Sequence, residues 1–219
     1  MLFRSNTTGY SAEHLLFNTY MTKDIDQKKP NKVAFAYDIS SYHSFENGAM
    51  KITGNSLDLA IKGTGFFAVE TPLGTRYTRA GNFQIDPSGA LITSDGKPVL
   101  GDVGQRITIP PDARDITIGS AGNISVDGEE IAKLGIYKFE NPQLLEKTDG
   151  ASFKSAADPL VADDAVVAQG VLEDSNVKPV IELTHLIDVS RSVSTTAKFV
   201  EVMYDLQRKT ASTYAQQNA

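Results

Sequence analysis

Short stretches in which apolar and polar residues alternate fill the middle of the chain. LDLAIK, FFAVE, FQID and KLGIYKF show this pattern, and turn sequences such as TPLGT, DPSG and SDGKP separate them. Alternation with period two predicts strands, and short strands about ten residues apart are typical of sandwiches and barrels. The pattern therefore predicts a mainly β protein with a central sandwich or barrel-like domain over residues 33–174.

The pattern changes near residue 175, after which glycine is absent and proline occurs once, at Pro179. Apolar residues then recur at alternating steps of three and four, the heptad spacing of a helix that packs against another helix. We predict one long helix over residues 175–219, with Ser175 or Asn176 as its N-cap and Pro179 in its first turn. The row consists of Leu183, Leu186, Ser190, Val193, Ala197, Val200 and Tyr204, and Phe199, Met203 and Leu206 form a second row beside it.

A helix of this size would be about 60 Å long, which is more than a small β domain needs to cover its core. Either it packs back on the β domain, or it pairs with helices of other subunits in a bundle or coiled coil. We favour the second interpretation. The predicted self-assembly seam consists of Leu183, Leu186, Val193, Ala197, Val200 and Tyr204.

Residues 1–32 form a third region, which we interpret as a terminal segment and linker. Leu15, Leu16, Thr19 and Tyr20 lie at helical spacing, so a short helix is expected between Thr8 and Asp26. The stretch DIDQKKPNK that follows is expected to form a loop, since it is polar and contains a proline.

Composition narrows the function classes. The formal net charge is −6, which argues against a nucleic-acid partner because such proteins normally carry a basic face. The chain has no cysteine, so disulfides, thiolate metal sites and cysteine nucleophiles are excluded. The first residues, MLFRSNTTGY, lack the apolar stretch of a secretory signal, so any export is expected to proceed without a cleaved signal peptide.

No set of residues predicts catalysis. His14, His43 and His185 lack partners at metal-ligand spacing, and KGTGFF lacks the third glycine of a dinucleotide fingerprint. Asp86 opens the turn DPSG and Asp95 belongs to an Asp-Gly turn, so both aspartates have a structural explanation. We therefore expect no enzymatic activity, no cofactor, no metal and no small-molecule substrate.

The segment YTRAGNFQIDPSG places a tyrosine and an arginine among turn residues. Arg76 and Arg79 lie three apart on a predicted strand and would point to opposite faces, which argues against a shared phosphate clamp. Tyr77 and Arg79 would share a face, where a stacked or ion-paired arrangement is expected.

Several of these stretches resemble the signatures of the flagellar basal-body rod and hook family. LDLAIKGTGFFAVETPLGTRYTRAGNFQIDPSGALITSDGKPVLG is similar to one signature, GVLEDSNVKPVIELTHLIDVSR to a second, and NTTGYSAEHLLF to a segment near the start of members. The motif positions are Asp58, Gly63, Gly65, Phe66, Phe67, Tyr77, Thr78, Arg79, Gly81, Phe83, Gly89, Gly96, Ser175, Asn176 and Val177.

The resemblance implies a structural subunit of the basal-body rod, with SNVKPV and the modest length closer to proximal-rod members. Such proteins are exported through the flagellar type III apparatus and assemble in the periplasm as a helical tube with their terminal helices inside. Implied partners are further copies, other rod subunits and the export apparatus. Family members also begin with a helix of roughly 25 residues, and we expect that helix to be missing here.

Two alternatives stay open on the residues alone. A secreted β-sandwich module that binds a glycan or another surface ligand would explain the β region but not the C-terminal helix, and the chain has no tryptophan for an aromatic platform. A hydrolase would need two acidic residues in one cleft, and the sequence offers no evident pair.

Overall fold

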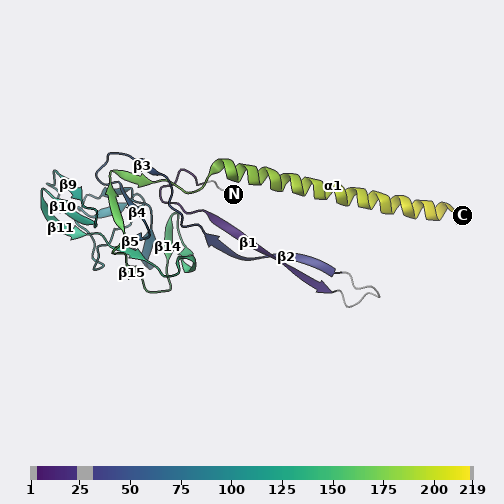
Figure 1. Ribbon diagram of the computed structural model, residues 1–219, viewed down its shortest axis with the longest axis horizontal. Helices are drawn as coiled ribbons and strands as arrows, with labels where there is room; N and C mark the ends of the chain where they lie inside the picture. Colours follow the sequence, from purple (N-terminus) through teal and green to yellow (C-terminus); the bar gives the residue numbers. More distant parts are fainter. Residues whose placement is uncertain (1–3, 24–31, 218–219) are drawn as a thin grey trace. The chain divides into compact units, whose positions relative to one another are not determined.

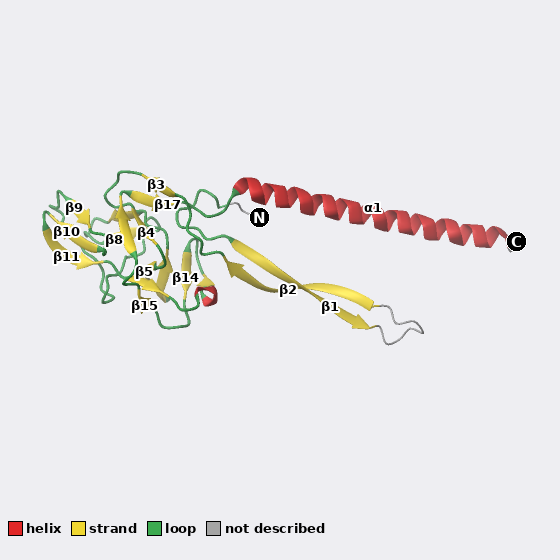
Figure 2. Ribbon diagram, viewed as in Figure 1, coloured by secondary structure: helices red, strands yellow, loops and turns green. Residues whose placement is uncertain are grey.

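The computed structural model describes residues 4–23 and 32–217 (Figure 1). The chain divides into two compact units, residues 1–177 and residues 178–219. Strands dominate the first unit, and a long helix makes up the second (Figure 2). The predicted class, mainly β with a terminal helix, is confirmed.

The largest sheet of the first unit has six antiparallel strands. The hairpin of β5 (Phe66–Thr71) and β6 (Gly74–Thr78) lies at its centre, with Phe67 opposite Thr78 and Thr71 opposite Gly74. The order across the sheet is β13 (Glu146–Lys147), β14 (Ser152–Lys154), β6 (Gly74–Thr78), β5 (Phe66–Thr71), β12 (Ile136–Lys138) and β15 (Leu160–Val161).

Smaller sheets surround it, and none of the described sheets closes into a barrel. One has three strands, β9 (Ile116–Ile118), β10 (Asn123–Val126) and β11 (Glu129–Lys133). The two-stranded sheets pair β3 (Met50–Ile52) with β17 (Val171–Glu173), β4 (Leu59–Lys62) with β16 (Val166–Gln169), and β7 (Phe83–Ile85) with β8 (Leu91–Thr93). A short 3-10 helix, η1 (Pro142–Leu144), precedes β13.

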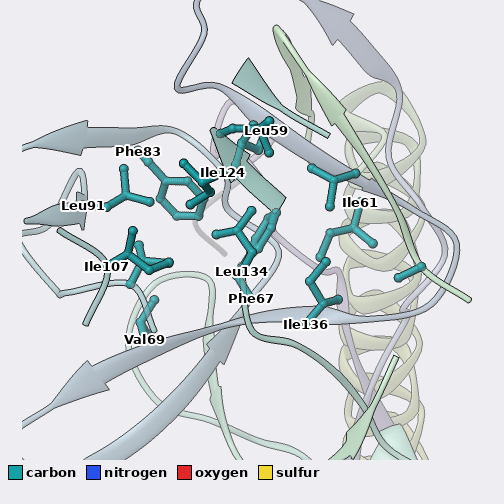
Figure 3. Packing of buried hydrophobic residues seen from close by; sticks show 14 of the residues in the cluster. Leu59, Ile61, Phe67, Val69, Phe83, Leu91, Ile107, Ile124, Leu134 and Ile136 are labelled. Atoms are coloured by element: carbon teal, nitrogen blue, oxygen red, sulfur yellow. The ribbon is translucent and has the colours of Figure 1, made fainter. Parts of the chain in front are cut away.

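Two clusters of buried side chains lie on either side of β5. Phe67 and Val69 belong to the main core, which also contains Leu59, Phe83, Ile124 and Leu134 (Figure 3). Phe66 and Ala68 belong instead to a second group. Alternating side chains of one strand thus serve both clusters, as the period of two requires. We call the second group the aromatic cluster, and its rings are Phe45, Phe66, Tyr77, Tyr137, Phe139 and Phe153.

The N-terminal region differs from the prediction. Instead of a helix between Thr8 and Asp26, the structure has a two-stranded antiparallel hairpin of β1 (Glu13–Lys23) and β2 (Lys32–His43), with a register shift between Leu16 and Phe17. The helix prediction was wrong because β-branched and aromatic residues crowd both segments, and each segment supplies the other's backbone partners. Most of the predicted loop, residues 24–31, lies outside the described residues.

The second unit is α1 (Pro179–Gln217), a helix of 39 residues. It begins four residues after Ser175 and contains the whole predicted row from Leu183 to Tyr204. The hydroxyls of Thr184, Thr195 and Thr196 donate to the carbonyls four residues earlier, which satisfies these polar groups within the helix. In the part of the chain that the structure describes, no helix is both long and apolar enough to cross a membrane.

Candidate functional site

The first part of the long signature builds β4, β5 and the turn between them. Asp58 precedes β4, and Gly63 and Gly65 occupy the turn that leads into Phe66 and Phe67. Gly65 has φ +149°, and a Cβ there would press on Ile136 at 3.0 Å. The GxG motif thus shapes a tight strand connection beside the core.

Gly81 lies where two backbone segments touch. Leu59 N donates to Gly81 O at 2.9 Å, and a Cβ on Gly81 would collide with Leu59 O. Asp58 and Asn82 form an isolated β-bridge beside this contact. Phe83, two residues after Gly81, is buried in the core. The close approach of the two backbone segments therefore sets the position of β7.

Gly89 and Gly96 of this signature lie in turns. Asp86 accepts hydrogen bonds from Ser88 N and Ala90 N, both at 2.8 Å, so the turn before Gly89 uses the aspartate as predicted. The Ser88 hydroxyl and the Ala90 amide lower the pKa of Asp86. Gly96 adopts φ +79° with open space around its α-carbon.

The arginine of the YTRAG stretch is buried and has a carboxylate partner. The Arg79 side chain is 7% exposed, and its Nη1 lies 3.3 Å from Oε2 of Glu173, at the end of β17. Arg79 also donates to Ile61 O at 3.2 Å and to Gly63 O at 2.7 Å. Its guanidinium carbon stands 5.3 Å from the centre of the Phe66 ring.

These contacts correct one detail of the prediction for this strand. Arg79 stacks on Phe66, whereas Tyr77 packs edge-on against Phe139, with ring centres 4.8 Å apart. Arg76 donates to Thr75 O at 2.9 Å, so the two arginines have different partners. Phe66 takes the place expected for Tyr77 because β5 and β6 are adjacent strands.

Glu173 gathers two further segments around this ion pair. Its Oε1 accepts from Gly48 N at 3.0 Å, and its backbone carbonyl accepts from Gly9 N at 2.8 Å. A Cβ on Gly9 would collide with the Arg79 and Ala80 backbone, so the N-terminal segment lies directly on the YTRAG stretch. Burial raises the pKa of Glu173, and the charge of Arg79 opposes that shift.

Asn176 fastens the same segments a few residues later. Its Oδ1 accepts from Ala12 N at 2.7 Å, and its Nδ2 donates to Ser44 O at 2.8 Å and to Glu46 O at 2.9 Å. The Ser175 hydroxyl accepts from Val177 N. Neither side chain caps α1, so the N-cap prediction was wrong: Ser175 bonds to Val177 N, and Asn176 bonds to the segments that flank the hairpin.

Three signature stretches far apart in the sequence therefore meet within the first unit. The NTTGY stretch contributes Gly9, the YTRAG stretch contributes Arg79, and the EDSNV stretch contributes Glu173 and Asn176. We call these four residues the signature junction. Ala12 and Ser44, which it holds, immediately flank the β1–β2 hairpin, so the junction closes the base of that hairpin.

The six residues predicted as the assembly seam all lie on α1. Leu183, Leu186 and Val200 are 49%, 47% and 45% exposed, and Val193 and Tyr204 are 63% and 69% exposed. Ala197 is exposed as well. The apolar row therefore lies on the surface of α1.

Two of the three histidines contact aromatic rings. His14 stacks on Tyr42 with ring centres 5.0 Å apart, whereas His43 is buried beside Phe153. Across residues 4–23 and 32–217, the structure brings together no group of three potential metal ligands from His, Cys, Asp and Glu.

Comparisons with known proteins match most of the chain. Residues 60–126 match the flagellar hook protein FlgE/F/G D1 domain, and residues 168–213 match the C-terminal region of the flagellar basal body rod FlgEFG proteins. Together these ranges include the YTRAG stretch, the EDSNV stretch and most of α1.

Individual relatives are flagellar basal-body rod proteins as well. The basal-body rod protein FlgF of Caulobacter vibrioides is 36% identical over 93% of this chain and 84% of its own length. FlgF of Rhizobium meliloti is 37% identical over 86% of this chain and 78% of its own. The basal-body rod protein FlgG of Bacillus subtilis is 37% identical over 89% and 83%. The chain belongs to the flagellar basal-body rod protein family.

Proposed function

We propose that this chain is a structural subunit of the bacterial flagellar basal-body rod and has no catalytic role. It assembles with further copies and with other rod subunits into a helical tube. The observation that carries the proposal is the signature junction, where the family's motif residues make buried structural contacts and surround no reactive group.

The junction suits a subunit that must keep one shape among many neighbours. It joins the residues that flank the hairpin to the segment that leads into α1, through an ion pair and several hydrogen bonds. Buried and fully partnered polar groups of this kind restrict a segment to one arrangement. The first unit can therefore present its surfaces identically in each copy.

The exposed row on α1 supplies the contact between subunits in this proposal. Burying side chains such as Leu183 and Val200 between helices contributes roughly 1.5–3 kcal/mol each. Because the row lies on the surface of α1, that free energy is available for packing against helices of other subunits. Contacts that repeat head to tail without closing give a helical filament.

Two finer points belong to the same proposal. The subunit occupies the proximal rod, a position supported by the SNVKPV stretch and by the FlgF relatives. It reaches the rod through the flagellar type III export apparatus without a cleaved signal peptide.

A direct test is to delete the gene in its own bacterium and restore it with a tagged copy. Isolated basal bodies should contain the tagged chain in the rod, and the deletion should abolish swimming. Immunogold labelling would distinguish the proximal from the distal rod. Basal bodies that lack the tagged chain in cells with restored swimming would overturn the proposal.

A further inference from the structure

His43 is the last residue of β2 and is only 6% exposed. Its ring meets the aromatic cluster edge-on, with centres 5.4 Å from Phe153 and 6.1 Å from Phe45. Its backbone carbonyl accepts from Nε2 of Gln143 in η1 at 2.9 Å. His43 thus provides a second attachment of the inner end of the hairpin to the β domain, beside the signature junction.

The ring of His43 has a buried nitrogen that lacks a hydrogen-bond partner. Nδ1 of His43 is buried and is the one buried side-chain nitrogen or oxygen without a hydrogen-bond partner in the described part of the chain. An imidazolium donates from both ring nitrogens, so a proton on Nδ1 would have no acceptor there. Leaving a buried charged donor unpaired is strongly unfavourable.

Charged groups from two neighbouring elements act on the ring in opposite directions. Glu13 lies opposite His43 across the β1–β2 ladder and favours the protonated ring, whereas Lys147 of β13 disfavours it. The other packed elements present Phe45 and Phe153, which carry no charge. Burial is the largest influence and lowers the pKa of His43.

We propose that His43 is an acid-sensitive anchor of the β1–β2 hairpin. The neutral ring seats the inner end of the hairpin in the aromatic cluster, and a proton on Nδ1 expels the ring from it. Acid therefore weakens the attachment of the base of the hairpin, which the signature junction also holds, while the main core, to which His43 does not belong, stays folded. This inference concerns the single chain and holds whether or not the chain assembles into a rod.

The direction of the effect follows from proton linkage. The detached ring takes up its proton near the ordinary value of about 6.5, and the seated ring only at lower pH. Between those two values the detached state binds more protons, so acidification favours detachment. For one proton, the equilibrium constant for opening rises by up to about tenfold per pH unit.

Hydrogen exchange of the full chain between pH 8 and pH 5 tests this inference, with rates corrected for the intrinsic effect of pH. Amides of Glu13–Leu16 and Ser40–His43 should lose protection below about pH 6.5, by up to about tenfold per pH unit. In His43→Phe, which keeps an aromatic ring but cannot be protonated, that loss should disappear. His14→Gln and His185→Gln are matched controls that should keep it.

A titration of the unmodified chain gives a second measurement that does not depend on the variant folding. The ring protons of His43, followed by NMR, should shift with a midpoint below 6.5. A midpoint at or above 6.5 would overturn the anchor, and so would an unchanged acid-dependent loss of protection in His43→Phe.

Discussion

Arg79 and Glu173 are 94 residues apart in the sequence and form an ion pair of 3.3 Å in which both side chains are less than 8% exposed. Each belongs to a different signature stretch of the rod family. Glu173 also accepts from Gly48 N, so the pair connects a segment that precedes β4 in the sequence with two segments that follow β5. This ion pair gives Arg79 a structural role, although an arginine beside a tyrosine could also suggest an active site.

Removing the arginine should destabilise the first unit strongly. In Arg79→Met the Glu173 carboxylate would stay buried without its cation, and breaking a buried pair in this way costs about 3–5 kcal/mol. Urea denaturation monitored by circular dichroism would measure the loss. Arg106→Met is the matched control, since Arg106 pairs with Glu70 on an exposed surface and its loss should barely move the midpoint.

The same variant should acquire a distinct pH dependence. Burial already raises the pKa of Glu173, and without Arg79 the pKa should rise further because the largest opposing influence is gone. A carboxyl group with a raised pKa in the folded state stabilises it at low pH, and that contribution is lost as pH rises through the folded value. The melting temperature of Arg79→Met, relative to the unmodified chain, should therefore fall from pH 5 to pH 8. The double variant Arg79→Met/Glu173→Gln should lack this trend, and a trend that persists there would assign it to another group.

Replacing Asn176 should reduce stability less than replacing Arg79, and the effect should be spread over three segments. Asn176→Ala removes one accepted and two donated hydrogen bonds and leaves Ala12 N and two carbonyls unpaired. The expected cost is about 2–3 kcal/mol, with faster hydrogen exchange at Ala12. Asn123→Ala serves as the control because its single side-chain bond to Glu130 is exposed. Equal losses in both variants would argue against the junction.

The sequence predicts those features of the structure that depend on residues close together in the chain. The strands around Phe66 and Phe83, the Asp86 turn and α1 follow from periodicity and turn chemistry within a few residues. The β1–β2 hairpin does not, because the spacing of Leu15, Leu16, Thr19 and Tyr20 suits a helix until the second segment supplies a partner strand.

The signature junction lies further beyond sequence reasoning. The sequence pattern draws attention to Arg79 and not to its partner Glu173, although both occur in the stretches that resemble the family. The chain has 27 acidic residues whose charge would allow them to pair with Arg79, and only the fold shows that Glu173 does so. The glycine of NTTGY was a usable signal, because a glycine in a motif often marks a close backbone approach.

Two glycines of the long signature should respond differently to the same substitution. A methyl group on Gly81 would collide with Leu59 O, which cannot move without disturbing β4, so Gly81→Ala should cost at least about 3 kcal/mol. Gly96 has open space and φ +79°, so Gly96→Ala should cost only about 1–2 kcal/mol from its left-handed backbone. Thermal denaturation of both variants measures the difference. A reversed order would show that the backbone contact at Gly81 yields easily.

The seam on α1 should be needed for assembly and not for folding of the chain. Val193 is 63% exposed, so Val193→Asp should leave the melting temperature of the purified chain nearly unchanged. In a rod that assembles through the proposed seam, the same change would place a carboxylate among apolar side chains, which costs several kcal/mol for each buried carboxylate. Swimming of a strain that carries the variant should therefore be lost. Ser192→Asp adds the same charge at an exposed position outside the row and should leave swimming intact. Normal swimming with Val193→Asp would remove Val193 from the seam, and equal loss with Ser192→Asp would show that any charge on this helix blocks assembly.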